Sequence, residues 1–413
     1  MSLKWKIRNE LTKRSRLMKK LIDAAAFRKN SRRYKAQAVN PVQDNVIVFM
    51  SFMGNKYADS PRAIYEYMLN NPEYDKYEFC WFFKNPDKYR FLENNSRTRV
   101  YKYNSDDHYR YYATAGYWVT NSRVPDVIPR REGQVYLQCW HGTPLKRLGF
   151  DVKVHGANAK YTPKDVSRQY GIDAMKYTYM TSPSRFCTEK FISAFGLDKV
   201  GREDIIIEKG YPRNDFLSNF TEEDVKRIKK QFDLPEDKKI ILYAPTWRDN
   251  QHTSGVGYVY KEEVDFDRLR EELGDEYIIL FRAHYFVANK FDFDRYEGFI
   301  RDVSGYDEIN DLYVISDMLI TDYSSVFFDY AILKRPIIFY MYDLEMYRDE
   351  VRGFYISLDE LPGPVITEGE KLAPAIIAGL NGEPDSRYAA FNKKYNYLDD
   401  GGACRRVAET VFH

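Results

Sequence analysis

A chain of 413 residues is longer than one compact core usually sustains, so we expect two domains of roughly 150 to 200 residues each. With 44% hydrophobic and 30% charged residues, 36 Tyr and 26 Phe, the composition excludes disorder over most of the length. The formal net charge of +2 is unevenly divided, because residues 1–37 hold 13 basic and 2 acidic side chains (+11) and the rest holds 50 and 59 (−9). An acidic body argues against a nucleic-acid-binding protein.

The basic head, residues 1–37, has apolar side chains at steps of three or four residues and Lys or Arg on its other faces. These apolar residues are Leu3, Ile7, Leu11, Met18, Leu21, Ile22 and Ala25. The pattern predicts an amphipathic helix that lies on anionic lipid, where each cation contributes about 1 kcal/mol. A helix packed on the body, or a tail that contacts nothing, is the alternative.

After the head, apolar strands alternate with helices in two series. The first domain, 40–220, has expected strands at 45–49, 79–83, 118–120 and 135–140 and helices at 62–69 and 109–115. The second, 221–413 with a C-terminal helix, has expected strands at 239–244, 277–282, 318–321 and 336–340 and helices at 261–273, 306–315 and 324–333. Such alternation predicts an α/β fold of two doubly wound, Rossmann-like domains with parallel sheets and a cleft between them.

The four cysteines, Cys80, Cys139, Cys187 and Cys404, form no CxxC pair, so we expect neither a disulfide framework nor a zinc site. The longest apolar runs are shorter than the about 18 residues that span a bilayer. The head has no continuous apolar stretch after its basic residues, so we expect no secretory signal. A cytoplasmic protein, or one attached to the inner face of a membrane, fits these features.

A histidine follows the expected strand at 135–140, in Gln138-Cys-Trp-His-Gly-Thr-Pro-Leu-Lys146. In doubly wound sheets ligands bind at the carboxyl ends of strands. There His141 can serve as a general base at neutral pH, Gly142 allows a sharp turn, and Thr143, Lys146 and Arg147 suit an anionic substrate. A histidine that only satisfies a loop by hydrogen bonds is the alternative.

The second domain has two further motifs at strand ends. Arg282 and His284, in RAHY, are two cations suited to a diphosphate, although alternate residues of an extended strand point to opposite sides. In TDYSSVFFDY, Ser324 and Ser325 open a helix whose free N–H groups bind anions. Asp329 lies one turn farther on, within reach of a ribose. Thr321 and Asp322 belong to the same candidate site, and helix capping is the alternative for Asp322 and Ser324.

Two other motifs offer candidate substrate contacts. YAPTWRD ends the strand at 239–244 and places Pro245, Thr246 and Arg248 toward the cleft. GYPRND, with Arg213 and Asp215, lies near the domain junction, where a hinge turn explains it equally well.

Metal-binding and nucleotide motifs of other classes are missing from the sequence, which has no Walker A loop, GxGxxG, HExxH or DxD. Its six histidines show no ligand spacing. We therefore expect no protein-bound metal, although free Mg²⁺ is compatible with a diphosphate substrate.

Taken together, the residues predict a nucleotide diphosphate site in the second domain that faces a histidine base of the first, the arrangement of a GT-B type transferase. The motifs resemble the CDP-glycerol glycerophosphotransferase family, the teichoic acid primases and polymerases of Gram-positive bacteria. The resemblance runs from about residue 45 to the end through VIVFMSFMGNKYADSPRAIYEYM, CWHGTPLKRLGFD, GYPRND, YAPTWRD, RAHY and TDYSSVFFDYAILKRPIIFY, in that order.

The resemblance implies roles at matching positions. His141 matches the catalytic base, and His284, counted with it as catalytic, together with Ser324 and Ser325 matches residues that hold the donor's pyrophosphate. Asp329 resembles the acidic residue that contacts the ribose in related GT-B enzymes. Family polymerases often carry an additional N-terminal domain, so we expect a primase-like or single-addition enzyme.

The implied reaction is transfer of glycerol phosphate from CDP-glycerol to a hydroxyl of a lipid-linked saccharide or teichoic acid acceptor, with release of CMP. It would take place at the cytoplasmic face of the cell membrane, which residues 1–37 would contact. Transfer from CDP-ribitol is the nearest alternative, and a nucleotide-sugar glycosyltransferase, a cytidylyltransferase and a non-catalytic membrane scaffold are the others. The sequence leaves open the acceptor, the number of units added and a homo-oligomeric state.

Overall fold

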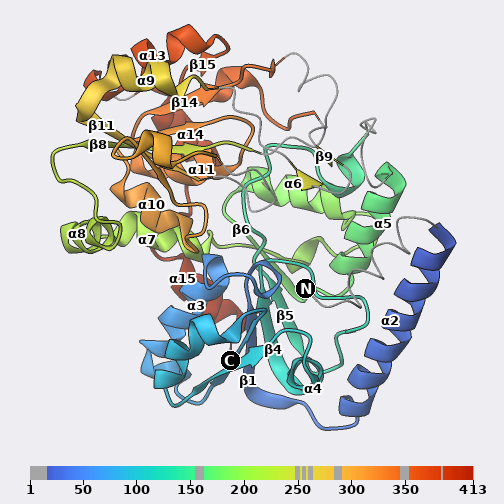
Figure 1. Cartoon of the computed structure of the whole chain (residues 1–413). Coiled ribbons are helices and arrows are strands. Elements are labelled where there is room, and N and C mark those ends of the chain that lie inside the picture. The colour runs from blue at the N-terminus through green and yellow to red at the C-terminus, as the bar shows by residue number, and fades with distance from the viewer. Residues whose placement is uncertain are drawn as a thin grey trace.

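The computed structural model describes residues 16–153, 162–246, 252–253, 257–258, 264–282, 291–344, 353–382 and 385–412. The predicted site residues Arg248 and His284, and Leu3, Ile7 and Leu11 of the head, lie outside these ranges. Two sheets form the centres of two lobes, one above the other in Figure 1.

The first sheet is fully parallel, in the order β3-β2-β1-β4-β5-β6-β7. Its strands are β1 (Gln43–Met50), β2 (Glu78–Phe83), β3 (Thr98–Lys102), β4 (Ala115–Thr120), β5 (Val135–Gln138), β6 (Tyr179–Ser182) and β7 (Ile206–Glu208). The helices up to its end are α2 (Arg16–Gln37), α3 (Asp59–Leu69), α4 (Asp106–Thr114), α5 (Pro163–Ala174) and α6 (Arg185–Phe195), and the connection to the second sheet carries α7 (Asp215–Asn219) and α8 (Glu222–Gln231).

The second sheet is also parallel, in the order β12-β11-β8-β13-β14-β15. Its strands are β8 (Lys239–Ala244), β11 (Tyr277–Phe281), β12 (Ile300–Asp302), β13 (Met318–Thr321), β14 (Ile337–Tyr340) and β15 (Val365–Ile366). Separately, β9 (His252–Thr253) and β10 (Gly257–Tyr258) pair in antiparallel orientation. The helices are α9 (Phe266–Leu273), α10 (Ile309–Ile315), α11 (Val326–Tyr330), α13 (Leu372–Asn381), α14 (Arg387–Tyr395) and α15 (Ala403–Val411).

Both sheets are doubly wound, as predicted. Counted within each sheet, the first six strands follow the order 3-2-1-4-5-6, and the direction of winding reverses between β1 and β4 and between β8 and β13. At such a switch point the loops after the two strands diverge to opposite faces and leave a crevice for ligands. Each lobe therefore has a crevice at the carboxyl ends of its central strands.

The continuous apolar runs of the sequence are explained by burial on both faces of the sheets. In β1, Val46 and Val48 belong to the core on one face, and Ile47 and Phe49 belong to the core on the other. All four side chains are at most 2% exposed. A strand that alternates between two cores needs apolar residues at every position, which is why its sequence lacks a polar side.

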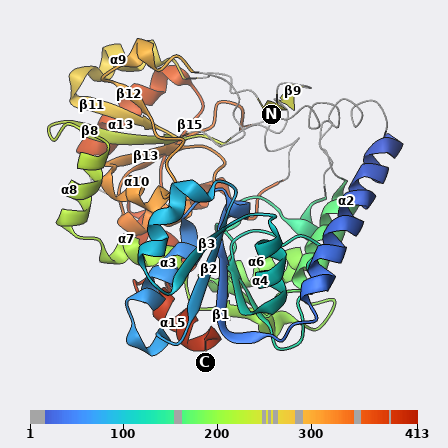
Figure 2. The ribbon, with the colours of Figure 1, turned by 60° about the horizontal axis from the view of Figure 1, so that its bottom comes forward.

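The C-terminal helix α15 packs against the first sheet, although the sequence places it with the second. Val407, Ala408 and Val411 belong to the core cluster that contains β1 and β2 residues, and the ring of Phe412 lies 6.0 Å from that of Tyr77. Figure 2 shows α15 in red below the first sheet, far in sequence from its neighbours. The chain therefore crosses twice between the lobes, and the boundary at 220/221 stays a prediction.

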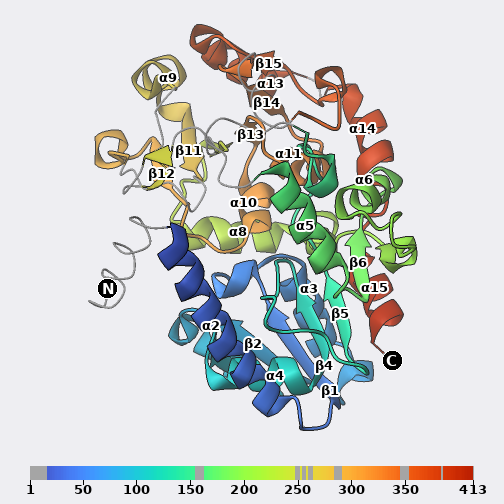
Figure 3. The same cartoon turned by 90° about the vertical axis from the view of Figure 1, so that its right-hand side faces the viewer.

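The described part of the head is helical and its C-terminal end is anchored. Arg33 pairs with Asp106 at 2.8 Å, and the Tyr34 hydroxyl donates to the Pro129 carbonyl at 2.7 Å, so α2 lies against α4 (Figure 3). Toward the other end of α2, Leu21 and Phe27 are 58% and 50% exposed. Among the described residues, no helix combines the length and apolar character that a membrane crossing requires.

Candidate active site

His141 leaves the first sheet through a sharp turn at the end of β5. The Cys139 N–H still donates to the Thr120 carbonyl of β4 at 2.7 Å, but Trp140 has a φ of +53°. This left-handed conformation is costly for a residue other than glycine and is typical of functional sites. The Trp140 N–H is held by the Gln138 side-chain oxygen at 2.9 Å, and the turn ends the strand two residues earlier than predicted.

The imidazole of His141 has a defined tautomer. Its Nδ1 lies 2.9 Å from the Asn121 carbonyl oxygen, which can only accept a hydrogen bond, so Nδ1 carries the proton. The lone pair of Nε2 is then available to a substrate. The ring is solvent-accessible and stacks on Trp140 with 4.6 Å between centroids.

The surroundings keep His141 neutral. Although His141 keeps some exposure to solvent, desolvation by the surrounding protein lowers its pKa below the usual 6.5, and the Asn121 hydrogen bond and the charge of Asp59 oppose this shift only in part. A histidine with a lowered pKa is unprotonated at neutral pH, the state that a general base requires.

Asn121 organises the first switch point, and sequence reasoning missed it. Its side-chain oxygen accepts from the Phe52 N–H at 2.8 Å, and Ser122 Oγ accepts from the Met53 N–H at 2.9 Å, which ties the loop after β1 to the loop after β4. The buried Asn121 Nδ2 has no partner in the described part of the chain. The sequence offers one signal for Asn121, which is its position directly after the strand that ends at Thr120.

The second switch point is built from four predicted site residues. Asp322 accepts from both the backbone N–H and the hydroxyl of Thr246, each at 2.8 Å, and Thr321 donates to the Ala244 carbonyl at 2.8 Å. Pro245 is half-buried beside them. The loops after β8 and β13 are therefore joined as the loops after β1 and β4 are, and Asp322 orients Thr246 instead of capping α11.

The two switch points meet at Gly142 and Ser325. A Cβ placed on Gly142 would lie 2.6 Å from Ser325 Oγ, so a larger residue here would require the Ser325 side chain to move. Ser324 Oγ accepts weakly from the Val326 N–H, at 3.5 Å. Because α11 has only five residues, its dipole is small, and the two hydroxyls and local N–H groups are its main contribution to an anion site.

The residues after Gly142 dock on the second lobe. Lys146 bridges Phe354 in antiparallel pairing, and the Arg147 N–H donates to the Gly353 carbonyl at 3.2 Å. Both side chains are half-buried. Thr143 instead faces the first core, where its hydroxyl accepts from the Cys187 thiol at 3.7 Å.

Arg213 and Asp329, both predicted to bind substrate, are bound to each other. Two nitrogens of the Arg213 guanidinium donate to the Asp329 carboxylate at 3.1 Å each, and Asn214 adds a third bond at 3.0 Å. Arg213 also lies 3.7 Å from Asp59. Arg213 and Asp329 are buried, so this pair joins the segment after β7 to α11, and a ribose contact by Asp329 stays a prediction.

Asp215 caps the C-terminal helix. Its carboxylate accepts from the Ala403 and Cys404 N–H groups at 2.8 and 2.7 Å, at the first turn of α15. These N–H groups have no partner within their own helix, so the contact satisfies them. The structure thus places Asp215 away from the group formed by His141, Gly142 and Ser325, and its assignment to substrate stays a prediction.

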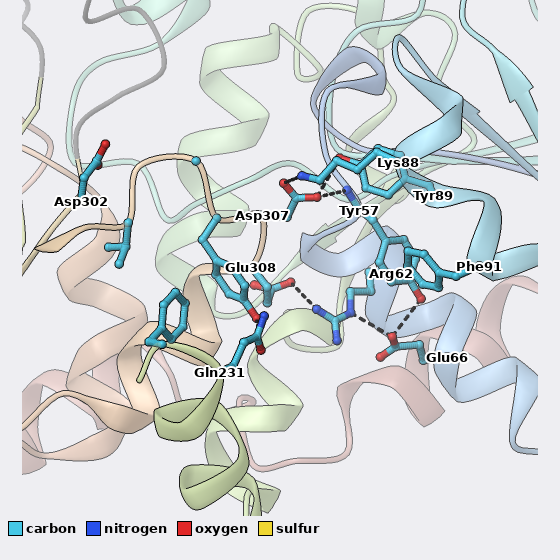
Figure 4. A pocket seen from close by; sticks show the side chains of 14 residues that line it. Tyr57, Arg62, Glu66, Lys88, Tyr89, Phe91, Gln231, Asp302, Asp307 and Glu308 are labelled. Atoms are coloured by element: carbon cyan, nitrogen blue, oxygen red, sulfur yellow. Dashed lines mark hydrogen bonds and ion pairs between the residues drawn. The ribbon is translucent and has the colours of Figure 1, made fainter. Parts of the chain in front are cut away.

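A pocket of about 680 Å³ opens between the lobes (Figure 4). Its lining comes from residues 57–91 of the first lobe and from residues 231–232 and 302–308. In its wall, Lys88 pairs with Asp307 at 2.8 Å, and the Arg62 guanidinium lies between Glu66 at 2.9 Å and Glu308 at 3.9 Å. Residues of α3 and of the loop before α10 therefore bind each other across the junction. In the described ranges, no three His, Cys, Asp or Glu side chains gather as a metal site.

Comparison with known proteins extends over nearly the whole chain. The sequence model of the family described as CDP-Glycerol:Poly(glycerophosphate) glycerophosphotransferase matches residues 32–413. The teichoic acid poly(glycerol phosphate) polymerase of Staphylococcus epidermidis is 40% identical over 412 residues, with 98% of this chain and 55% of the relative aligned. The enzyme of the same description from Bacillus subtilis is 43% identical over 385 residues, with 90% and 49% aligned.

The chain thus spans about half the length of these two relatives. Among solved structures, that of the wall teichoic acid polymerase TagF superimposes with a TM-score of 0.82 and 38% identity, covering 98% of this chain and 97% of that one. The two-domain α/β architecture is therefore shared as well as the sequence motifs.

Proposed function

Because this chain belongs to the CDP-glycerol:poly(glycerophosphate) glycerophosphotransferase family, as its motifs predicted, we propose that it transfers glycerol phosphate from CDP-glycerol to a hydroxyl of a membrane-linked teichoic acid acceptor, with release of CMP. One observation carries the proposal at the level of residues. The loop that holds His141 and the loop that holds Ser325 touch at Gly142, so a base from one lobe faces hydroxyl donors from the other.

His141 acts as the general base. With Nδ1–H fixed on the Asn121 carbonyl, Nε2 removes the proton of the acceptor hydroxyl, whose oxygen attacks the glycerol-bearing phosphorus of the donor. The phosphorus–oxygen bond to CMP breaks as the new one forms. The proton stays on His141 until solvent takes it, and the product is a phosphodiester.

The second lobe stabilises the charge that builds up on the phosphoryl oxygens. Ser324 and Ser325 offer hydroxyls beside the second switch point, where the Thr246 hydroxyl already donates to Asp322, and Arg282 offers a guanidinium at the end of the neighbouring strand β11. Fixed donors of this kind dominate catalysis of phosphoryl transfer. We assign His284 to the same task because of its place in the RAHY motif. Lys146, Arg147 and Pro245 complete the proposed substrate surface.

The pair Arg213–Asp329 is proposed as a support for this surface. Asp329 lies on α11, four residues after Ser325, and its carboxylate is held by Arg213 and Asn214. Asp329 thereby fixes the helix that follows the serines, and any ribose contact would add to this role.

The decisive experiment replaces the base. His141→Ala should reduce CMP release from CDP-glycerol by at least ~100-fold, the usual scale for a general base, with CDP affinity by calorimetry nearly unchanged. A parallel assay with CDP-ribitol, analysed by mass spectrometry with a lipid-linked acceptor, identifies the alditol. Near-normal turnover of the variant with either donor would remove His141 from this role.

The head is proposed to place the enzyme on the cytoplasmic face of the membrane, as a peripheral protein. The support is the charge of +11 over residues 1–37, together with the exposed side chains of Met18, Leu21 and Phe27 on α2. Anionic lipid would attract the cations, and the apolar side chains would enter the interface. The acidic body would remain in the cytosol and direct its cleft toward a lipid-linked acceptor.

A further inference from the structure

A single carbonyl oxygen receives two cationic side chains from opposite lobes. Lys56, in the loop between β1 and α3, donates from Nζ to the Tyr306 carbonyl at 3.2 Å. Arg282, at the end of β11, donates from Nη1 to the same oxygen at 3.0 Å and to the Val303 carbonyl at 3.3 Å. The two charges are therefore held close together where the lobes meet.

Neither cation has a carboxylate partner among the described residues. In the part of the chain that the structure describes, no Asp or Glu oxygen lies within ion-pair distance of Lys56 or Arg282, and the Arg282 guanidinium bonds only to backbone carbonyls. The nearby carboxylates are engaged elsewhere. Asp307 accepts from Lys88 at 2.8 Å and from the Tyr89 hydroxyl at 2.7 Å, and Glu308 accepts from the Asp59 N–H at 2.9 Å.

Charges removed from water are normally paired in proteins. Here burial, together with the charges of Arg282 and Lys88, lowers the pKa of Lys56 to about 8, and the charges of Asp307 and Glu308 act in the opposite direction. Burial also lowers the pKa of Arg282. The protein thus holds two half-buried, like-charged groups together at an energetic cost that a bound anion would relieve.

We propose that Lys56 and Arg282 form a phosphate-binding site shared between the lobes. Its ligand is a phosphate group that accepts from both cations and so draws the two lobes together. This proposal rests on the proposed function for the source of that group. Either the diphosphate of the donor or the terminal phosphodiester of a growing acceptor would supply it.

The location agrees with both sources. β11 is adjacent to β8, whose loop holds Thr246, and β8 is adjacent to β13, whose loop leads to the serines. Neighbouring strands lie about 4.8 Å apart, so Arg282 is within about 10 Å of the second switch point along the strand ends. The Tyr306–Glu308 segment also lines the pocket between the lobes in Figure 4, so the site borders an opening to solvent.

The test compares Lys56→Gln with Lys56→Arg in the full chain. The matched control is Lys84→Gln, an exposed lysine of the same lobe that donates to the Asn55 side chain at 2.9 Å. Calorimetry with CDP and with inorganic pyrophosphate should show at least ~10-fold weaker binding for Lys56→Gln if the donor is the source, the scale of one lost charge-assisted hydrogen bond. Lys56→Arg should bind nearly as wild type does, and Lys84→Gln should be unaffected.

If the acceptor is the source, CDP affinity stays constant and the KM for an acceptor that ends in glycerol phosphate rises at least ~10-fold in Lys56→Gln, again with recovery in Lys56→Arg. Both results support the site. Unchanged ligand affinities and unchanged KM in Lys56→Gln would overturn it, as would equal losses in Lys56→Gln and Lys56→Arg, because a structural role alone would then explain them.

A pH series provides a second readout. Between pH 7 and 9 the affinity of the wild type for the anion should fall as Lys56 loses its proton, whereas Lys56→Arg should retain it. Arg282, Lys88, Asp307 and Glu308 also face Lys56 and are the same in both proteins, so the comparison with Lys56→Arg isolates the proton of the lysine. The site and the proposed function can fail separately. If pyrophosphate binding depends on Lys56 but the wild type releases no CMP from CDP-glycerol or CDP-ribitol, the proposed function is wrong and the site stands.

Discussion

Gly142 and Ser325 lie so close that a methyl group on Gly142 would displace the Ser325 side chain. A Cβ on Gly142 would be 2.6 Å from Ser325 Oγ and 3.3 Å from Ser325 Cβ. Gly142 belongs to the lobe of the proposed base, and Ser325 belongs to the lobe of the proposed phosphate site. The contact therefore sets the approach of the two lobes at the point where the reaction is proposed to occur.

Gly142→Ala should separate the two loops. We expect a loss of about 1–3 kcal/mol in the free energy of unfolding, the usual cost of overpacking, and a clear decrease in kcat/KM because the base and the phosphate site move apart. Urea denaturation and a CMP-release assay measure the two effects. In a Ser325→Ala background the added methyl has more room, so the same change should destabilise less; an equal loss in both backgrounds would contradict the contact.

The pH dependence of catalysis should report the lowered pKa of His141. As the base must be neutral, kcat/KM should rise with pH through the pKa of His141 and reach a plateau, and this limb should lie below pH 6.5 because desolvation disfavours the imidazolium. Rates at acceptor concentrations well below KM, between about pH 4.5 and 8, provide the measurement. The residual activity of His141→Ala should not show this rise of kcat/KM with pH. A rise centred above pH 6.5 in the wild type that disappears in the variant would contradict the lowered pKa of His141.

The buried pair Arg213–Asp329 should be one of the most sensitive positions of the fold. Asp329→Asn leaves the Arg213 charge buried with only Asp59 nearby, at 3.7 Å, so we expect a loss of about 3–5 kcal/mol in the free energy of unfolding at pH 7. The control is Glu409→Gln, which breaks the exposed pair with Arg405 at a cost of about 0–1 kcal/mol. Similar small losses for both variants would mean that the buried pair contributes little.

Asp215→Ala distinguishes a helix cap from a substrate contact. The structure shows the carboxylate on the first N–H groups of α15, so its removal should cost about 0.5–2 kcal/mol in stability. CDP affinity and turnover, measured below the melting transition, should match the wild type. A fall in CDP affinity without a change in stability would instead support the substrate role that the GYPRND motif suggested.

The sequence predicted the elements whose signals are local. β1, β8 and β13 are continuous apolar runs, and the motifs at their ends sit where a doubly wound sheet binds ligands. The short strands β6 (Tyr-Met-Thr-Ser) and β7 (Ile-Ile-Glu) escaped prediction because their polar residues interrupt any apolar run and so few residues carry no periodicity.

Contacts between distant segments were not predictable. Asp329 looked like a ligand group because nothing near it in sequence reveals Arg213, which is buried against it from the other side of the junction. α15 was assigned to the nearer lobe by chain position, yet its apolar side completes the first core. Lys56 is one lysine among many until the fold brings it to the same carbonyl as Arg282.

The exposed apolar residues of α2 offer a test of the head that leaves the body intact. Removing residues 1–37 would also remove Arg33 and Tyr34, which anchor the helix on α4 and near Pro129, and so would confuse lipid binding with folding. Leu21→Ser with Phe27→Ser changes only two exposed side chains. We expect weaker sedimentation with vesicles of phosphatidylglycerol, an unchanged melting temperature, and unchanged turnover of a water-soluble acceptor. Binding equal to that of the wild type would exclude α2 as the lipid contact, while the assignments at His141 and Ser325 would stand.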